Sequence, residues 1–134
     1  MKTKKLAAMP PPTRLMQIAA IALASVWLVL GVIEQIIPQN FTSMYGLEIT
    51  GAAGHTYVRG IGARNIVLAW TVIFTAIAGF RAPLIAMSAG LSVMSALEFF
   101  IAFFAVGFSG AIRFLVFTLV LAALTLWIAL SKKK

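Results

Sequence analysis

Four long runs of apolar residues dominate the pattern of this chain. They cover residues 15–37, 61–80, 84–106 and 111–130. Each run is close to the roughly 20 residues that a helix needs to cross a hydrocarbon core of ~30 Å. None alternates strictly between apolar and polar positions, as a strand of a membrane barrel would. The pattern therefore predicts an all-α membrane protein, a four-transmembrane-helix antiparallel bundle that makes a single domain over residues 1–134.

The three connections between these runs differ in length. Residues 81–83 and 107–110 are short, so each is predicted to join antiparallel neighbours, with Pro83 in the first turn of the third helix. The first connection, residues 38–58, predicts a long outer loop between helices one and two, either a solvated linker or an element that caps the bundle. An alternative is that the second helix begins early and projects outward as far as Gly51.

The basic residues are distributed unevenly over the two sides that such a topology defines. Eight of the eleven lie on one side: Lys2, Lys4, Lys5, Arg14, Arg81, Lys132, Lys133 and Lys134. The other three are Arg59, Arg64 and Arg113. The positive-inside rule then predicts a multi-pass protein of the cell's inner (cytoplasmic) membrane with both termini in the cytoplasm. The net charge of +8 lies at the ends of the runs and forms no soluble basic face, so nucleic acid is excluded as a partner.

Composition narrows the chemistry further. The chain is 62% hydrophobic, which excludes an ordinary soluble domain. Cysteine is absent and histidine occurs once, as His55. Thiolate chemistry and haem held by two axial histidines are therefore excluded, and no metal site is predicted. The chain itself carries no cofactor signature.

Each apolar run carries one charged residue in its outer half. These four residues are Glu34, Arg64, Glu98 and Arg113. Glu98 is the deepest, about 12 Å below the outer boundary of its helix. An ionisable side chain at such depth costs roughly 2.5–3.5 kcal/mol on insertion scales, and it is a functional-site candidate by default.

Helical phase extends this group of four charges. Arg64 shares a helix face with Tyr57 and Thr71, whereas Arg59 and His55 fall near the opposite face. We interpret the group as an outward-opening pocket for a hydrophobic ligand with one polar end. Glu98 is the candidate catalytic residue. The candidate ligand-binding residues are Arg64, Glu34, Arg113, Tyr57, Thr71, Arg59 and His55. His55 has the alternative of a solvated loop residue.

A structural explanation competes with the pocket. Two buried ion pairs, for example Glu98 with Arg64 and Glu34 with Arg113, would fix the registry of the helices without binding anything. The three tryptophans are expected to pack in the core: Trp27, Trp70 and Trp127.

The stretch YGLEITGAAGHTYVRGIGARNIVLAW, residues 45–70, resembles the signature of DoxX-like small four-helix membrane proteins. The matching elements are Tyr45-Gly46-Leu47 and the segment from Arg59 to Asn65. The resemblance is strongest to a branch known only as a domain of unknown function. It implies a four-helix bundle with a polar site, in a family whose members include accessory subunits and proteins linked to quinone-coupled oxidation. Many relatives have an acidic residue where Asn65 stands here, so no acid role is carried over to it.

Three hypotheses for function follow. The first is that the chain is a binding or redox-accessory protein, in the lipid bilayer, for a lipophilic small molecule such as a bound quinone or lipid. The second is a membrane enzyme in which Glu98 acts as a general acid or base and Arg64 stabilises developing charge. The third is an accessory or structural subunit of a larger membrane complex or a homo-oligomer.

Overall fold

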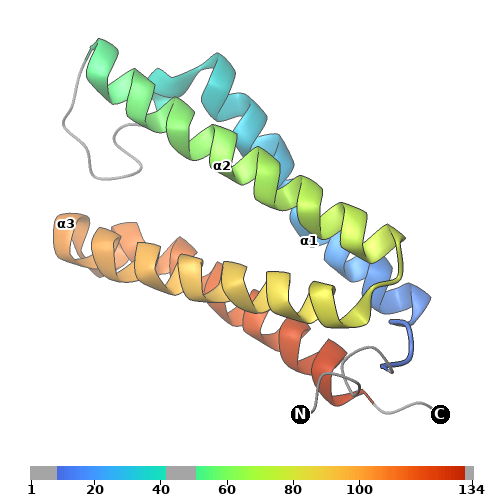
Figure 1. The fold of residues 1–134 in the computed structure, drawn as a ribbon. Coiled ribbons are helices and arrows are strands. Elements are labelled where there is room, and N and C mark those ends of the chain that lie inside the picture. The colour runs from blue at the N-terminus through green and yellow to red at the C-terminus, as the bar shows by residue number, and fades with distance from the viewer. Residues whose placement is uncertain (1–8, 42–50, 132–134) are drawn as a thin grey trace, which may run out of the picture.

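The computed structural model describes residues 9–41 and 51–131, and this part of the chain is all-helical. Its elements are α1 (Arg14–Ile36), the short 3₁₀ helix η2 (Pro38–Asn40), α2 (Ala52–Ile77) and α3 (Arg81–Leu130), as Figure 1 shows. Within the described ranges, α1, α2 and α3 are each long and apolar enough to cross a membrane. The all-helical prediction is confirmed. The six lysines of the two termini lie outside the described residues.

Helix α1 matches its predicted span to within a residue at each end. Thr13 caps its start by accepting a hydrogen bond from the backbone N–H of Met16. It ends at Ile36, and its C-cap Ile37 directly precedes Pro38, whose ring disfavours a helical conformation at the residue before it. Hydropathy and local capping therefore agree at both ends of this element.

Helix α2 corrects the predicted boundaries of the second span. It begins at Ala52, not at residue 61, and it ends at Ile77, not at residue 80. The early start after Gly51 was the stated alternative, and it removes residues 52–58 from the predicted loop. The centre of that loop, residues 42–50, lies outside the described residues.

A left-handed glycine closes α2. Gly79 has φ 71°, its N–H donates to the carbonyl of Ala76, and the N–H of Phe80 donates to that of Thr75. This pair of bonds is the Schellman motif, which favours glycine because a Cβ is strained at positive φ. The turn therefore lies at residues 78–80, and the predicted connector 81–83 is already the first turn of α3, with Pro83 tolerated there as expected.

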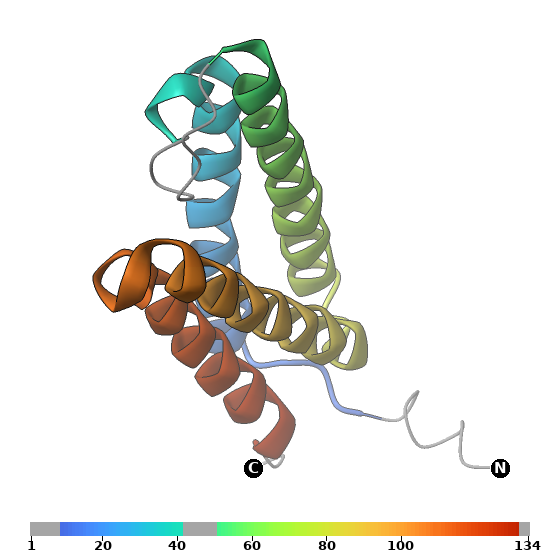
Figure 2. The same ribbon diagram turned by 90° about the vertical axis from the view of Figure 1, so that its left-hand side faces the viewer.

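Helix α3 changes direction at Gly107, whose φ of 76° and ψ of −179° are not helical. Figures 1 and 2 show the ribbon folding back there, so that two limbs, residues 81–106 and 108–130, lie side by side. Ser92 Oγ donates to the carbonyl of Thr118 at 3.2 Å, and Ser95 Oγ donates to that of Phe114 at 3.0 Å, from the first limb to the second. The predicted four-residue connector 107–110 thus reduces to one residue, because residues 108–110 are helical.

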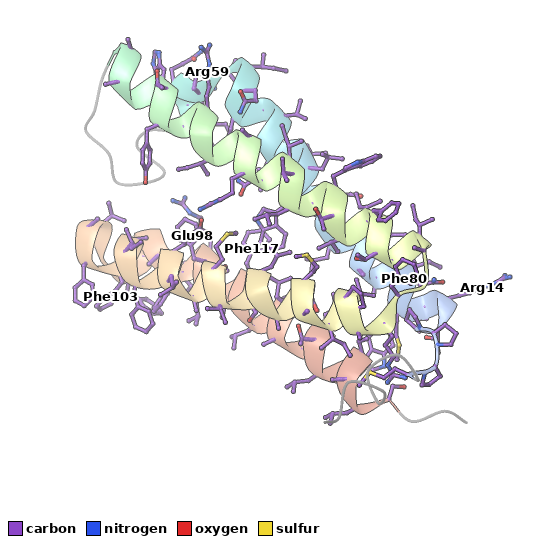
Figure 3. All side chains as sticks on the ribbon, viewed as in Figure 1. Arg14, Arg59, Phe80, Glu98, Phe103 and Phe117 are labelled. Atoms are coloured by element: carbon purple, nitrogen blue, oxygen red, sulfur yellow. The ribbon has the colours of Figure 1, made fainter. Side chains whose placement is uncertain are left out.

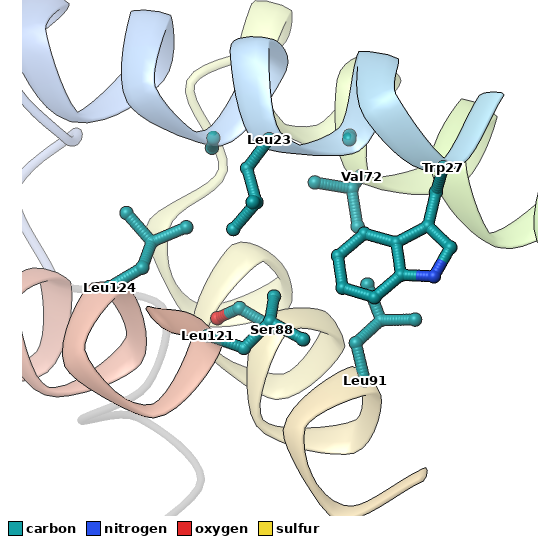
Figure 4. A pocket seen from close by; sticks show the side chains of 9 residues that line it. Leu23, Trp27, Val72, Ser88, Leu91, Leu121 and Leu124 are labelled. Atoms are coloured by element: carbon teal, nitrogen blue, oxygen red, sulfur yellow. The ribbon is translucent and has the colours of Figure 1, made fainter. Parts of the chain in front are cut away.

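Side chains from α1, α2 and both limbs of α3 meet in one apolar core (Figure 4). The space between them is about 10 Å³, which is at the limit of what one water molecule needs, so this region is packed protein and not a ligand site. Trp27 lies in this core with its ring centroid 4.9 Å from that of Phe117. The core prediction was wrong for Trp70 and Trp127, which are 64% and 41% exposed.

The start of α1, the turn between α2 and α3, and the end of α3 come together at one end of the molecule, here called the turn end. There Gln17 Nε2 donates to the carbonyl of Ala76 at 2.8 Å. The buried Arg81 donates to the carbonyls of Ile128 and Ser131. Figure 3 shows Arg14 and Phe80 at this end and Glu98 toward the other, here called the cavity end.

Candidate ligand site

An ion pair joins α2 to the first limb of α3 at the cavity end. Arg64 Nη2 donates to Glu98 Oε1. The two side chains are 40% and 20% exposed, so the pair is only partly covered by protein. Figure 3 shows Glu98 on the side of α3 that faces α2. One of the two pairings proposed from the sequence is thereby present.

A second polar contact lies deeper and joins α2 to α1. Asn65 Nδ2 donates to Glu34 Oε2 at 3.0 Å, and both side chains are buried. Asn65 Oδ1 lies 3.5 Å from Arg64 Nη2, at the outer limit for a hydrogen bond. A chain of polar groups therefore runs from α1 through α2 to α3: the Glu34 carboxylate, the Asn65 amide, the Arg64 guanidinium and the Glu98 carboxylate.

A close approach of two helices makes the contact between Glu34 and Asn65 possible. A Cβ on Gly62 would lie 2.8 Å from the carbonyl oxygen of Gly31, and a Cβ on Gly31 would lie 2.7 Å from that of Gly62. Glycine at both positions thus lets the backbones of α1 and α2 touch, as small residues do at membrane helix crossings. Glu34 and Asn65 each follow their glycine by three residues, so even the short amide side chain spans the gap.

The outer cavity opens beside the ion pair, between α2 and α3. It offers about 130 Å³ to water-sized molecules. Its lining is Tyr57, Ile61, Arg64, Glu98, Ile101, Ala102 and Phe114. The polar groups thus form one part of a wall that is otherwise aliphatic and aromatic.

The inner cavity lies behind Glu98 and is smaller, with about 30 Å³. Its lining is Trp27, Leu30, Glu34, Asn65, Ser95, Glu98, Arg113, Phe114 and Phe117. Glu98 and Phe114 line both cavities, so these two side chains are the shared wall. The guanidinium carbon of Arg113 lies 4.8 Å from the ring centroid of Phe114, which places the cation over that ring.

The structure brings together five of the candidate residues and separates the other three from them. Tyr57, Arg64 and Glu98 line the outer cavity, and Glu34 and Arg113 join Glu98 at the inner one. The remaining three, Thr71, Arg59 and His55, line neither cavity.

These three side chains have other surroundings. Thr71 Oγ1 donates to the carbonyl of Val67 in its own helix. Arg59 Nε donates to the carbonyl of Gln35 at 3.3 Å, and the Gln35 amide donates back to the carbonyl of Arg59, which ties α2 to α1. His55 is half-buried in the first turn of α2. The structure therefore places none of these three side chains at the ion pair between Arg64 and Glu98.

Sequence reasoning missed Asn65 and Ser95. Asn65 was set aside because it departs from an acidic position in the resembling family, yet here it holds the buried Glu34. Ser95 is buried at the wall of the inner cavity. The available signal for Asn65 was its spacing from Gly62, which repeats the spacing of Glu34 from Gly31.

Comparisons of the chain with protein-family models, with curated proteins and with solved structures found no match. The functional argument therefore rests on the geometry of the two cavities and the polar groups between them.

Proposed function

We propose that this chain is a small integral membrane protein that binds a lipophilic small molecule with one polar end in the outer cavity. The observation that carries the proposal is the cavity itself, an apolar space of about 130 Å³ whose polar groups are Tyr57 and the Arg64–Glu98 ion pair. Ligand pockets commonly combine such apolar walls with a few placed polar groups that fix orientation.

The same proposal gives the chain four spans, made by α1, α2 and the two limbs of α3. Large apolar side chains are exposed along all three helices, for example Ile18 at 62%, Phe74 at 62% and Phe104 at 82%. A continuous apolar exterior is unfavourable in water and normal against lipid tails. With the turn end on the cytoplasmic side, as the charge bias predicts, the outer cavity belongs to the half of the bundle away from the cytoplasm.

The dimensions and chemistry of the cavity favour a ring-shaped head group of quinone type. An apolar cavity of about 150 Å³ accepts a benzene ring, so one ring fits a space of this order. A ring carbonyl would accept a hydrogen bond from the Arg64 guanidinium, and a ring hydroxyl would donate one to the Glu98 carboxylate. An apolar tail would then leave between Ile61 and Ile101 toward the lipid. Membership of the DoxX-like family is part of this proposal, on the resemblance of residues 45–70.

Quinone titration of the purified chain tests this function. Trp27 borders the inner cavity, so its fluorescence in a Trp70→Phe/Trp127→Phe background reports a quinone bound on the other side of the shared wall. A short-chain quinone should quench it saturably. Arg64→Gln should weaken the affinity for the quinone, and Glu98→Gln the affinity for its reduced quinol, each about 10- to 100-fold, the loss expected for one hydrogen bond to a charged group.

Thr71→Val is the matched control, because Thr71 shares a helix face with Arg64 but bonds only within α2. It should bind the quinone like the parent. The proposal fails if mass spectrometry finds no lipid or quinone that co-purifies with the chain and if Glu98→Gln leaves the affinity for the quinol unchanged.

A second candidate function is an enzyme that uses Glu98 as a general acid or base on the same class of lipophilic molecule. The specific observation is that Glu98 lines both cavities while Arg64 is bonded to it, which places a proton carrier and a fixed positive charge together. Turnover of a co-purified ligand that survives in Glu98→Gln would remove this candidate and leave binding as the function.

A further inference from the structure

The inner cavity is lined by polar side chains that come from all three long helices. Glu34 of α1, Asn65 of α2 and Ser95 of α3 are 1%, 4% and 1% exposed, and Arg113 enters from the second limb of α3. Buried polar groups are costly in hydrocarbon-like surroundings unless a hydrogen-bonding partner reaches them. The arrangement therefore suits a polar ligand, unlike the apolar packing in Figure 4.

The size of the inner cavity limits what that ligand is. A water molecule needs at least about 10–15 Å³ of such space and two to four polar partners. The cavity provides about 30 Å³, which holds one or two water molecules and no ring or chain. The head group proposed for the outer cavity is therefore excluded from the inner one on size.

The charges around the inner cavity narrow the choice further. Arg113 disfavours a metal cation, and the two carboxylates, Glu34 and Glu98, disfavour an anion. A neutral molecule that both donates and accepts hydrogen bonds suits both signs. Water meets this requirement, because it can donate to a carboxylate and accept from a guanidinium.

We propose that the inner cavity binds one or two water molecules that connect the buried Glu34 carboxylate to Glu98. Ser95 Oγ donates to the carbonyl of Phe114, so its lone pairs are available to accept a hydrogen bond from this water. The water gives Glu98 a hydrogen-bonding partner on the side away from the outer cavity. The role of this water as a partner for Glu98 at the ligand cavity rests on the proposed function, whereas the water site itself does not.

Radiolytic labelling in ¹⁸O-water tests the site on the full chain in lipid nanodiscs with no ligand added. Hydroxyl radicals formed from a bound water label the aromatic side chains beside it. Trp27 and Phe117 line the inner cavity, and Trp27 is only 7% exposed. Both should incorporate ¹⁸O, and Tyr57, which is 56% exposed at the outer cavity, serves as the internal standard for bulk water.

Ser95→Val fills part of the inner cavity and removes a polar partner, so it should abolish the label at Trp27 and Phe117 while Tyr57 stays labelled. Ser92→Val is the matched control. Ser92 also donates from the first limb of α3 to a carbonyl of the second, but it does not line the inner cavity. In Ser92→Val the amount of ¹⁸O label at Trp27 should equal that in the parent chain.

Two results would overturn the water site. One is an unlabelled Trp27 beside a labelled Tyr57 in the parent chain, which decides the matter even if Ser95→Val does not assemble. The other is a label at Trp27 that survives in Ser95→Val. Because no quinone is present, either result leaves the outer-cavity proposal standing, and failure of quinone binding leaves the label unaffected.

Discussion

Two arginines at opposite ends of this molecule have different surroundings. Arg81, at the turn end, is 8% exposed, and its guanidinium donates to the backbone carbonyls of Ile128 and Ser131. Arg64, at the cavity end, is 40% exposed and donates to the Glu98 carboxylate beside the outer cavity. Both side chains join helical segments that are far apart in the sequence.

The difference separates a residue that holds the fold from one that borders the cavity proposed to bind a ligand. The last carbonyls of a helix have no partner within the helix, and a cation near them also complements the helix dipole. Arg81 thereby fastens the end of α3 to its beginning. The guanidinium of Arg64 and the carboxylate of Glu98 both border the cavity, so a ligand there could contact both charged groups. The comparison leads to variants that should affect stability at one end and binding at the other.

Arg81→Met should have the largest effect on stability. It removes the charged donor from two carbonyls, and each carbonyl left without a donor costs about 1–3 kcal/mol. Thermal and denaturant unfolding in detergent would measure the loss. Quinone affinity should stay at the parent value, because Arg81 is at the turn end. A stable Arg81→Met chain with weakened quinone binding would reverse the roles assigned to the two ends.

Gly62→Ala should come next, because its Cβ would meet the backbone of Gly31 and force α1 from α2. Overpacking of this kind costs about 1–3 kcal/mol. Gly60→Ala in the same helix is the control, since a Cβ there meets nothing within 4 Å. That change should stabilise α2 by about 0.5–1 kcal/mol, the usual helical advantage of alanine over glycine. Effects of the same sign in the two variants would show that the close crossing is absent.

Two side-chain amides allow a third comparison between the ends. Asn65→Leu removes the donor to Glu34 at the cavity end, and Gln17→Leu removes the donor to Ala76 at the turn end. Each substitution should lower the free energy of unfolding by at most about 1–3 kcal/mol. Only Asn65→Leu should also change the quinone affinity, because only Asn65 contacts the residues that line the cavities. Equal affinities in the two variants would separate Glu34 from the ligand site.

The helices could be predicted from the sequence because their signals are local. The length of the first apolar run placed α1 almost completely. The start of α2 was less clear, because residues 52–60 are rich in glycine and polar side chains and have low hydropathy. Tertiary packing supports this segment, where Gly54 and Val58 are buried. The sequence could not show that Trp70 and Trp127 face outward, because a helix that is apolar all round has no periodic signal that marks its buried face.

The site could be predicted only in part because it depends on which helices are neighbours. The chain order and the antiparallel runs placed Glu34, Arg64, Glu98 and Arg113 in the same outer half, and each of the four lines at least one of the two cavities. The contact between Asn65 and Glu34 depends on the crossing at Gly31 and Gly62, which is a property of two backbones together. No pattern within a single helix contains it.

The smallest expected change in stability concerns the ion pair itself. Arg64→Met with Glu98→Gln removes both charges at once, so no lone charge is left behind. Partly exposed pairs contribute about 0–1 kcal/mol, far less than the donors of Arg81, and the double variant should unfold within that margin of the parent chain. Its quinone affinity should nevertheless fall at least as far as in either single variant. If instead the double variant lost as much stability as Arg81→Met and kept its quinone affinity, the pair would be a structural link between α2 and α3, and the two ends of the molecule would serve the same purpose.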